Sequence, residues 1–321
     1  MKIGIFTAMF RDLSLDQLAA YVSGLGYEML EIPIWHGSPH LDTPEILRGN
    51  TKKIKETLKK NQLTISALNN AKSGQLVLGP LDASTDDWAP TKDPAAKVQF
   101  AMESMKNAAR VAAELEVPVV TSFVGSAVWD KWYIYPAANE HLYEQAWEVF
   151  TERWSAILKI YKEYGIQLAV ETHPNEMIYN IETAARALQE LGHYQEFGFN
   201  LDPSHFIWQL IDPVIFIKTF GPRIYHVHAK DGELQQDELR RSGVIPTGSW
   251  TRIDRGFRFR VPGWGDVQWR KFISALAQAG YNYVISYEHE DPVMSREDGC
   301  EKCIEFLKPL LIKKPLEQVW W

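Results

Sequence analysis

The chain contains only two cysteines, and so few thiols exclude a protein held together by a framework of disulfides. A reducing cytoplasm is therefore the compartment that we expect. The two thiols form the motif CEKC at Cys300 and Cys303, without the second C-x-x-C pair that a four-ligand zinc site needs. Because the segment has the pattern of a late helix interior, we interpret these thiols as structural.

Long apolar runs and a positive net charge are also missing. The apolar runs are far shorter than the roughly 20 residues that span a bilayer. The first of them is interrupted by Arg11 and Asp12 and has no small-residue cleavage site after it, so we expect a strand there and not a signal peptide. A net charge of −7 disfavours general binding to nucleic acid or to anionic membranes.

Short β-rich runs alternate with longer amphipathic stretches along all 321 residues. A strand followed by a helix, repeated eight times, predicts a parallel (β/α)8 TIM barrel, with residues 1–321 forming a single domain. The main alternative is an open doubly wound sheet, but its phosphate-binding turn, G-x-G-x-x-G, is absent after the first run. The eight expected strands begin at or near Lys2, Tyr27, Leu63, Val117, Ile166, Phe197, Arg223 and Tyr283.

A minimal barrel needs about 250 residues, so this chain has a surplus. The surplus falls in three segments, 71–93, 125–146 and 231–265, each of which follows an expected strand. Long βα loops at the C-terminal face are where barrels build active sites. Their aromatic residues either line a pocket for a flat or sugar-like ligand or pack the loops together. At this face we expect substrate contacts from Trp35, Trp264 and Arg260.

The last four expected strands end in an acid or an imidazole, whereas the earlier strands end without one. In AVETHPN, NLDPSH, HVHAKD and SYEHED, that group is the first after an apolar run. Consecutive strands are neighbours in a barrel, so the four side chains should converge. Three carboxylates and one imidazole suit Mn²⁺, and also Mg²⁺, Co²⁺ or Zn²⁺. Each acid alone could cap a helix, but four on adjacent strands favour a metal site of Glu171, Asp202, His228 and Glu288.

The stretch YHVHAKDG places several polar groups at the end of one strand. His226 and His228 share a face because strand side chains alternate with a period of two. His228 is nearer the C-terminal rim and is the better ligand, whereas His226 is expected to be a hydrogen-bonded core histidine. At the rim, Lys230 either holds a substrate oxygen or is a solvated lysine.

These motifs, together with PGWGDVQW and SYEHEDP, resemble the xylose-isomerase-like barrel superfamily of sugar phosphate isomerases and epimerases. Each motif alone is weak evidence for the family. The motifs together, in this order, are more specific, and the eight strand–helix units cover nearly the whole chain. The resemblance implies a divalent metal, often Mn²⁺, on the four residues named above. In ketose epimerases of this superfamily the two metal-bound glutamates also move protons, and that role would fall on Glu171 and Glu288. It further implies that His205 touches the substrate.

A narrower resemblance is to larger members that end in EHEDP and carry a tail like Trp320 and Trp321. Among them are the catalytic subunits of bacterial C-glycoside deglycosidases, which act on glycosides oxidised at the sugar 3-position and pair with a small β-rich subunit. AP endonucleases share the superfamily but add histidines on earlier strands, where this chain has Asn69, Asn70 and Phe123. We therefore set DNA repair aside.

The shared chemistry would be removal of a proton next to a carbonyl, which a divalent cation favours. Returning the proton gives epimerisation or isomerisation, whereas expelling a β-substituent gives elimination. Elimination needs a second acid or base, and His173 is the candidate. The alternative is that His173 only supports the loop in which it lies. His36, His40 and His141 are weaker candidates.

Three hypotheses remain. The preferred one is β-elimination from a 3-keto-glycoside, such as a C-glycoside, with a possible β-rich partner subunit. The second is an epimerase or isomerase of a free keto-sugar or its phosphate, for which Arg252, Arg255, Arg258 and Arg260 could bind phosphate. The third is a barrel that binds sugar or a partner without chemistry. We also expect an oligomer, as is common for such barrels, and we expect the C-terminal LEQVWW, which is costly to leave in water, to pack at a subunit interface or against the barrel wall.

Overall fold

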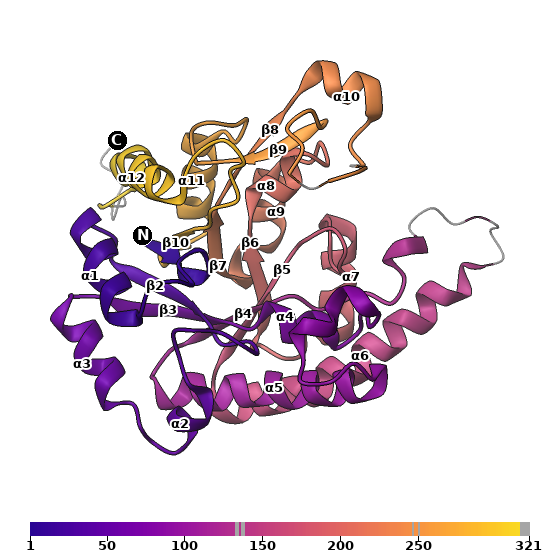
Figure 1. The fold of residues 1–321 in the computed structure, drawn as a ribbon. Helices are drawn as coiled ribbons and strands as arrows, with labels where there is room; N and C mark the ends of the chain where they lie inside the picture. Colours follow the sequence, from indigo (N-terminus) through magenta and orange to yellow (C-terminus); the bar gives the residue numbers. More distant parts are fainter. Residues whose placement is uncertain (132–134, 136–138, 246, 250, 315–321) are drawn as a thin grey trace, which may run out of the picture.

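Eight parallel strands close into a barrel in the order β1-β10-β7-β6-β5-β4-β3-β2 (Figure 1). The structure, a computed structural model, describes residues 1–131, 135, 139–245, 247–249 and 251–314. All eight expected strands are barrel strands, so the prediction of a (β/α)8 barrel is confirmed. They are β1 Lys2–Phe6, β2 Met29–Pro33, β3 Thr64–Asn69, β4 Val119–Ser122, β5 Gln167–Glu171, β6 Phe197–Leu201, β7 Ile224–Ala229 and β10 Val284–Tyr287.

Helices follow the strands along the chain, and local sequence fixes many of their ends. Ser14 begins α1 with a capping box to Gln17, and Gly26 ends it in a left-handed conformation. The helices are α1 Leu15–Leu25, α2 Thr43–Leu47, α3 Lys52–Lys60, α4 Ala71–Leu76, α5 Pro94–Glu114, α6 His141–Tyr164, α7 Ile181–Leu191, α8 Pro203–Ile207, α9 Pro213–Phe220, α10 Gln236–Ser242, α11 Trp269–Gln278 and α12 Arg296–Leu307.

The amphipathic residues 44–61 do not form one continuous helix. They are divided into α2 and α3, and Gly49 between these helices has φ +87°. That left-handed backbone cannot continue an α-helix, and glycine adopts it without steric cost.

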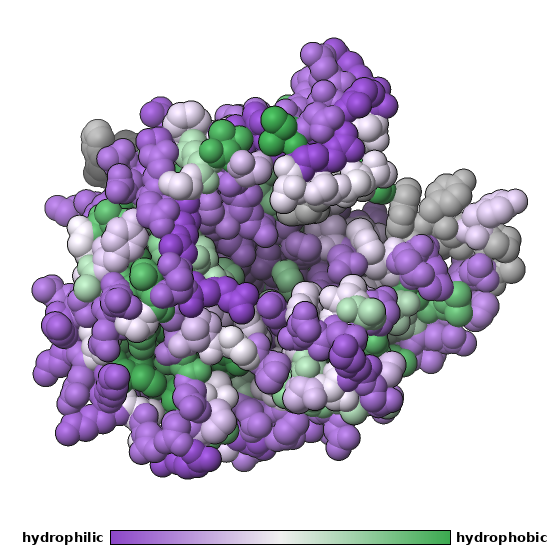
Figure 2. Space-filling view, in the orientation of Figure 1, coloured by the Kyte–Doolittle hydropathy of each residue, from purple (hydrophilic) through white to green (hydrophobic). Residues whose placement is uncertain are grey.

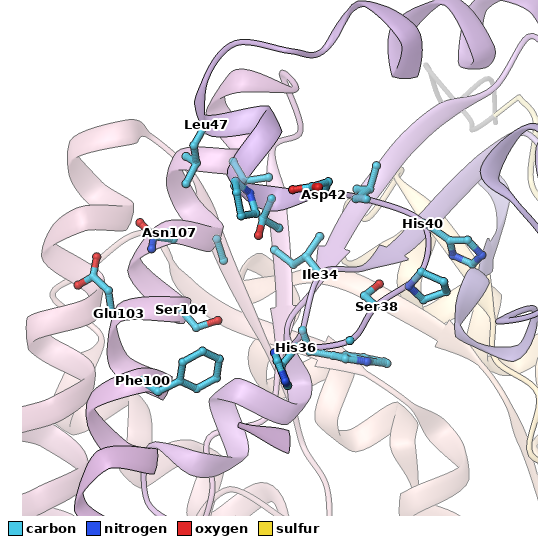
Figure 3. A pocket seen from close by; sticks show the side chains of 18 residues that line it. Ile34, His36, Ser38, His40, Asp42, Leu47, Phe100, Glu103, Ser104 and Asn107 are labelled. Atoms are coloured by element: carbon cyan, nitrogen blue, oxygen red, sulfur yellow. The ribbon is translucent and has the colours of Figure 1, made fainter. Parts of the chain in front are cut away.

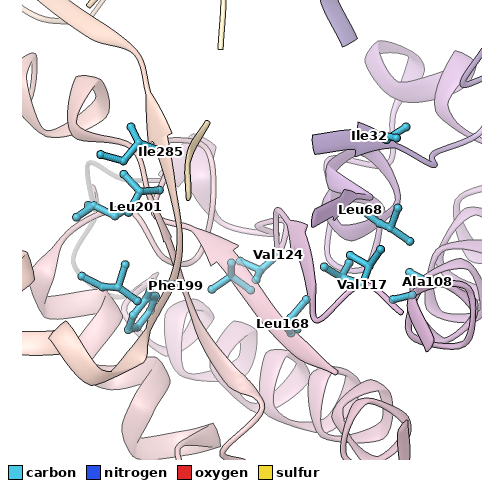
Figure 4. Packing of buried hydrophobic residues seen from close by; sticks show 14 of the residues in the cluster. Ile32, Leu68, Ala108, Val117, Val124, Leu168, Phe199, Leu201 and Ile285 are labelled. Atoms are coloured by element: carbon cyan, nitrogen blue, oxygen red, sulfur yellow. The ribbon is translucent and has the colours of Figure 1, made fainter. Parts of the chain in front are cut away.

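The main apolar core lies between the strands and the surrounding helices (Figure 4). Ile32, Leu68, Leu168 and Phe199 are side chains of four barrel strands, and all are fully buried. Ala108 of α5 packs into the same cluster. This packing makes the barrel a rigid frame, which holds the strand ends in fixed positions for a site.

Cys300 and Cys303 lie inside α12, as expected, and both are buried free thiols. Burial raises the pKa of Cys300 to about 12 and that of Cys303 well above its ordinary value. Because the thiolate is the reactive form, we expect neither thiol to react with a thiol reagent in the native protein at neutral pH. Both should react once the protein is unfolded in denaturant. Rapid labelling of the native protein would contradict this prediction.

The surplus segment 231–265 forms an arm that was not foreseen. Its strands β8 (Asp231–Leu234) and β9 (Phe257–Arg260) pair antiparallel, and α10 lies between them in the chain. Figure 1 shows this arm projecting from the barrel. The segment 71–93 contains α4 and a short 3-10 helix, Ala83–Trp88. Part of 125–146 and the expected tail contact of LEQVWW lie outside the described residues.

Asp231, the acid that follows Lys230 in YHVHAKDG, anchors the arm. The side chain is fully buried. Its Oδ1 accepts hydrogen bonds from the N–H groups of Gly232 and Val267, both at 2.9 Å. Its Oδ2 accepts from Gly263 N–H at 2.9 Å and from Trp269 Nε1–H at 2.8 Å. The carboxylate therefore fixes the PGWGDVQW turn against β8.

Replacing Asp231 with Asn is expected to lower the free energy of unfolding by about 3 kcal/mol, because an amide nitrogen would face buried N–H donors. The matched control is Asp266→Asn, since Asp266 accepts one hydrogen bond, from Leu234 N–H, in an exposed setting. Chemical denaturation measures both variants. Equal small losses in the two variants would contradict the anchoring role.

In the described part of the chain, no helix combines the length and the apolar character needed to cross a membrane.

Candidate active site

Glu171, Asp202, His228 and Glu288 converge at the C-terminal end of the barrel. One ligand atom from each lies within 4.8 Å of those of the other three. Glu171 ends β5, Asp202 follows β6, His228 lies in β7 and Glu288 follows β10. These strands are neighbours in the order β5-β6-β7-β10, which is why residues distant in sequence meet. The sequence predicted this convergence, and the structure shows it.

Asp202 combines the two roles that its sequence context left open. Its Oδ1 accepts a hydrogen bond from Ser204 N–H at 2.8 Å and so caps α8. Its Oδ2 accepts no hydrogen bond of normal geometry from the described residues, but lies 3.0 Å from Lys230 Nζ. One oxygen is thus used by the helix, and the other points to the cluster.

His228 presents its two ring nitrogens to different neighbours. Nδ1 faces the cluster, 3.2 Å from Glu288 Oε2 and 3.4 Å from Glu171 Oε2. Nε2 lies 2.9 Å from Oε2 of Glu31, a fully buried residue of β2. Burial opposes the charge of Glu31, but His228 and His226 lower its pKa to about 2. His226 is a hydrogen-bonded core histidine, as expected, with Nδ1 3.0 Å from Asn200 Oδ1.

Glu31 is the main functional residue that the sequence reasoning missed. The predicted ligands stand at strand ends, whereas Glu31 lies inside the apolar run MLEIP. A carboxylate between buried leucine and isoleucine is costly without partners, and that cost was the available signal.

Lys230 is not a solvated lysine, so that alternative is wrong. The residue is 2% exposed and contacts three carboxylates. Its Nζ donates to Glu288 Oε2 at 2.7 Å and to Glu290 Oε2 at 2.9 Å. Burial alone would lower the pKa of Lys230, but these acids and Asp202 raise it well above its ordinary value. A fixed ammonium therefore stands beside the cluster, at the side of Glu290.

His205 and His173 lie on another side of the cluster. His205 Nε2 is 3.2 Å from Glu171 Oε1 and 3.5 Å from Asp202 Oδ2. The rings of His173 and His205 meet edge to face, with centroids 4.1 Å apart. Burial and the charge of Lys230 lower the pKa of His205 to about 3, and burial with His205 lowers that of His173 well below its ordinary value. Both imidazoles are therefore neutral at physiological pH.

Aromatic rings surround the cluster. Phe6 stacks on the ring of His228, with centroids 6.0 Å apart, and Trp35 meets the edge of Phe6 at 5.9 Å. Phe259 of the arm lies 5.2 Å from the ring of His205. Trp35 is thus one ring away from a ligand of the cluster, at a place where it could contact a substrate.

The other predicted substrate contacts, Arg260 and Trp264, belong to the arm. Arg260 is paired with Glu233 at 2.6 Å and with Asp291 at 2.9 Å. Trp264 is 50% exposed, and the Arg260 guanidinium lies 5.9 Å from the centre of its ring. The charge of Arg260 is therefore already neutralised by its partners, whereas half of the Trp264 side chain remains accessible to solvent. Their contact with substrate stays a prediction.

A cavity of about 360 Å³ adjoins the cluster under the arm. Glu290 and Phe259, which contact Lys230 or His205, line one side of it. Arg252, Arg255 and Phe257 also line it. Figure 2 shows that the face below the arm is hollowed and mainly hydrophilic.

A larger cavity of about 760 Å³ lies between the loop after β2 and α5 (Figure 3). His36, Phe100 and Asn107 line it, and none of its lining residues belongs to the four-residue cluster. His40, also in its lining, is a structural residue: its ring nitrogens lie 3.1 Å from Thr7 Oγ1 and 3.0 Å from Phe10 O. Trp35 also lines this cavity, so the cavity reaches to within one ring, Phe6, of His228 but contains none of the four ligands.

The four-residue cluster fits a divalent cation. Three carboxylates and one imidazole are hard and borderline donors that suit Mn²⁺, Mg²⁺, Co²⁺ and Zn²⁺. Burial, together with Glu288 and Asp202, raises the pKa of Glu171 to about 8, although His228 and Lys230 oppose this. Such crowding of buried acids is what a bound cation relieves.

The closed barrel and the acids at its strand ends define a TIM-barrel protein with a possible metal centre. Residues 19–310 match the family described as "Xylose isomerase-like TIM barrel", and the chain belongs to that family.

Two curated relatives illustrate the range of similarity. The uncharacterized protein YfiH of Bacillus subtilis strain 168 is 27% identical over 317 residues, 96% of this chain and 98% of YfiH. Inosose dehydratase of Clostridium perfringens strain 13 is 24% identical over 156 residues, 48% of this chain and 51% of that relative. The match to the named dehydratase thus spans about half of each protein.

Solved structures share the fold. The probable 3-DHS dehydratase AsbF of Bacillus anthracis has a TM-score of 0.67 at 17% identity and covers 96% of this chain and 99% of its own. The 3-keto-D-glucoside 4-epimerase YcjR of E. coli has a TM-score of 0.68 at 12% identity, with 96% and 99% covered. IolI, solved with a zinc atom, has a TM-score of 0.63 at 20% identity, with 97% and 98% covered.

Proposed function

We propose that this protein is a divalent-metal-dependent enzyme that removes a proton next to the carbonyl of a keto-sugar. The observation that carries the proposal is the convergence of Glu171, Asp202, His228 and Glu288 beside the buried cation of Lys230. We propose Mn²⁺ as the metal, with Mg²⁺, Co²⁺ or Zn²⁺ as alternatives. The structure of IolI with zinc is consistent with a cation in this fold.

The four residues would hold the metal, which when bound would supply Lewis acidity that makes the C–H next to the carbonyl more acidic. We assign proton transfer to Glu288 and Glu171. The side chain of Glu288 is 17% exposed and so is open to a ligand, whereas Glu171 Oε1 faces the neutral ring of His205. Two carboxylates on different strands provide one base and one acid for the two faces of a substrate.

Substrate orientation falls to Lys230 and His205. The Lys230 ammonium is held by Glu288 and Glu290, so its position is fixed before a substrate arrives. A preorganised ammonium can bind a hydroxyl or carbonyl oxygen without a reorganisation cost. His205 is neutral and packs edge to face against His173. Its ring can therefore donate or accept a hydrogen bond to a hydroxyl or carbonyl oxygen of the same substrate.

The best specific reaction is β-elimination from a 3-keto-glycoside, such as a C-glycoside. In this reaction a carboxylate takes the proton next to the carbonyl, the C–H electron pair forms a C=C bond, and the bond to the β-substituent breaks. The leaving group then takes up a proton that comes from water, and we assign the neutral imidazole of His173 to relay it, accepting at one ring nitrogen and donating from the other, on the side of the site where it contacts His205. Two proteins similar to this chain carry the name dehydratase, and dehydration also expels a substituent.

The charges around the cavity under the arm favour an uncharged substituent over a phosphate. Arg258 is bound to Glu233 at 2.6 Å, and Arg252 is bound to Asp254 at 2.9 Å. Arg260 is also paired, as described above. Because three of the four candidate arginines are already paired with acids, a phosphate would gain less here than from open guanidinium groups, whereas the largely buried rings of Phe257 and Phe259 make part of the lining apolar.

The alternative reaction is epimerisation or isomerisation of a keto-sugar, which uses the same first step. The fold neighbour YcjR is a 3-keto-D-glucoside 4-epimerase. A small β-rich partner subunit, an oligomeric assembly and a cytoplasmic location remain proposals for this chain.

A product panel separates the reactions. Protein reloaded with Mn²⁺ is incubated with free keto-sugars and with 3-keto-O- and C-glycosides, and products are followed by chromatography and mass spectrometry. We expect release of the aglycone. A new sugar epimer or isomer without release would favour the alternative, and no change of any substrate would contradict the proposed activity.

A further inference from the structure

Glu31 is a buried carboxylate whose contacts come from four other strands of the barrel. Its Oε1 accepts hydrogen bonds from Asn69 Nδ2 at 2.8 Å and Thr121 Oγ1 at 2.7 Å. Its Oε2 accepts from Ser286 Oγ at 3.0 Å and lies 2.9 Å from His228 Nε2. A fully buried charge persists only when it is hydrogen-bonded in this way.

The contact with His228 determines which ring nitrogen carries the proton. A carboxylate only accepts hydrogen bonds, so the hydrogen of this contact must lie on Nε2. Nδ1 faces two further carboxylates, Glu288 at 3.2 Å and Glu171 at 3.4 Å. Burial opposes a charge on the ring, but Glu31, Glu288 and Glu171 raise the pKa of His228 well above its ordinary value, so Nδ1 also tends to carry a proton when no cation is bound. A cation would take the place of that proton on the Nδ1 lone pair, while Nε2–H stays on Glu31. The geometry is that of a carboxylate–histidine–metal arrangement.

We propose that Glu31 is a positioning residue that keeps His228 in the Nε2–H tautomer and thereby makes Nδ1 the metal ligand. The inference rests on the proposed metal function and adds a residue outside the four ligands. Glu31 touches neither the substrate side nor the solvent, since it is fully buried. Its effect on the reaction passes through His228.

A second metal site is not assigned to Glu31, His226 and His228, although their ligand atoms also lie within 4.8 Å of one another. Both oxygens of Glu31 already accept two hydrogen bonds each, as given above, and His226 Nδ1 contacts Asn200. These contacts make the group a support for the first site.

Replacing Glu31 with Gln is predicted to reverse the tautomer. Asn69 Oδ1 accepts a hydrogen bond from Ala71 N–H at 3.0 Å, which fixes the Asn69 amide with its Nδ2 toward residue 31. The oxygen of a glutamine at position 31 must therefore face Asn69, and its amide nitrogen must face His228. That nitrogen donates to Nε2, so the proton of the neutral ring moves to Nδ1 and blocks the lone pair.

The experiment measures Zn²⁺ affinity by calorimetry and the His228 tautomer by long-range ¹H–¹⁵N NMR on protein with ¹⁵N-labelled histidine, at a pH high enough for the His228 ring to be neutral, because the surrounding acids raise its pKa. We expect Glu31→Gln to lower the affinity about 10- to 100-fold and to shift the proton of His228 from Nε2 to Nδ1. The matched control is Ser286→Ala, which removes one donor to the same Glu31 oxygen but keeps the carboxylate. It should keep the tautomer and an affinity close to that of the wild type.

A double variant tests the orientation argument. Adding Asn69→Asp to Glu31→Gln keeps the total charge and places an acceptor where Asn69 had a donor. The glutamine should then rotate, present its oxygen to His228, and restore both the Nε2–H tautomer and most of the affinity. A residue that only filled space would show no such rescue.

The outcomes separate two failures. A wild-type protein with no measurable Zn²⁺ or Mn²⁺ affinity would overturn the proposed function, and the inference with it. Binding by the wild type with unchanged affinity and tautomer in a folded Glu31→Gln protein would overturn the inference alone. If Glu31→Gln does not fold, the double variant decides: the wild-type tautomer and affinity support the inference, and any other result overturns it.

Discussion

Asp202→Asn is expected to lower the affinity for Mn²⁺ by at least about 100-fold and to abolish the thermal stabilisation that the metal gives. The reason is the fixed role of Oδ1, which caps α8 through Ser204 N–H. An asparagine would keep that cap with its oxygen, so its amide nitrogen would face the cluster. A donor with no lone pair would replace a ligand, beside the ammonium of Lys230 at 3.0 Å.

The chain offers a close control for this substitution. Asp212 also precedes a proline and caps its helix, α9, with Oδ1 2.8 Å from Val214 N–H, but it lies outside the four-residue cluster. For the wild type and Asp212→Asn, metal at 100 times its Kd should stabilise the fold by about 2.7 kcal/mol. Calorimetry and thermal melts with and without metal measure both effects. Equal metal stabilisation in Asp202→Asn and Asp212→Asn would remove Asp202 from the ligand set.

Glu288→Gln is expected to lower turnover by about 10²- to 10⁴-fold, the range for loss of a general base. Glutamine cannot take the proton next to the carbonyl. It also weakens the fixed position of Lys230, whose Nζ donates to Glu288 Oε2 at 2.7 Å. The rate is to be measured with saturating Mn²⁺ and with the bound metal quantified, so that loss of the base is separated from loss of the metal.

Glu290→Gln is the control for Glu288→Gln. Glu290 bonds the same ammonium at 2.9 Å, but its side chain is 41% exposed and it is not one of the four converging ligands. We expect it to change the rate less than tenfold, well short of the loss of a general base. If both variants lost the same activity at full metal content, the loss would be explained by the displaced ammonium of Lys230, and Glu288 would not be the general base.

Much of the fold and of the cluster could be predicted from the sequence because the signals are local. Each barrel strand is a short, mainly apolar run, and three ligands are the first acid past such a run, as in LAVE and NLD, while the fourth, His228, is the second histidine of IYHVHA and the one nearer the rim. Neighbouring parallel strands then bring those ends together without further information. Asp202 shows that even the competing interpretation, a helix cap, was correct for one of its oxygens.

The missed features depend on contacts between distant segments. Glu31 is hydrogen-bonded by Asn69, Thr121, His228 and Ser286, and these partners approach it only when the barrel closes. No local pattern reveals such a set. The burial of Lys230 has the same origin, since its three acids come from the residue after β6 and from the segment after β10.

The arm was also beyond local reasoning. Its strands β8 and β9 are separated by more than twenty residues, and β9 reads FRFR, which suggested a basic cluster open to phosphate. The structure pairs Arg258 and Arg260 with Glu233 of the facing strand. Opposite charges across an antiparallel pair stabilise it and neutralise the arginines.

The most direct test of the central claim is metal-dependent hydrogen exchange. The protein is stripped of metal, reloaded with Mn²⁺ or left bare, and incubated in D₂O with keto-sugars and 3-keto-glycosides. Mass spectrometry then follows deuterium entering the substrate and release of the aglycone. The account predicts deuterium uptake, aglycone release or both only in the reloaded protein. Equal activity in the stripped protein, or tight metal binding without exchange or release from any substrate, would contradict it.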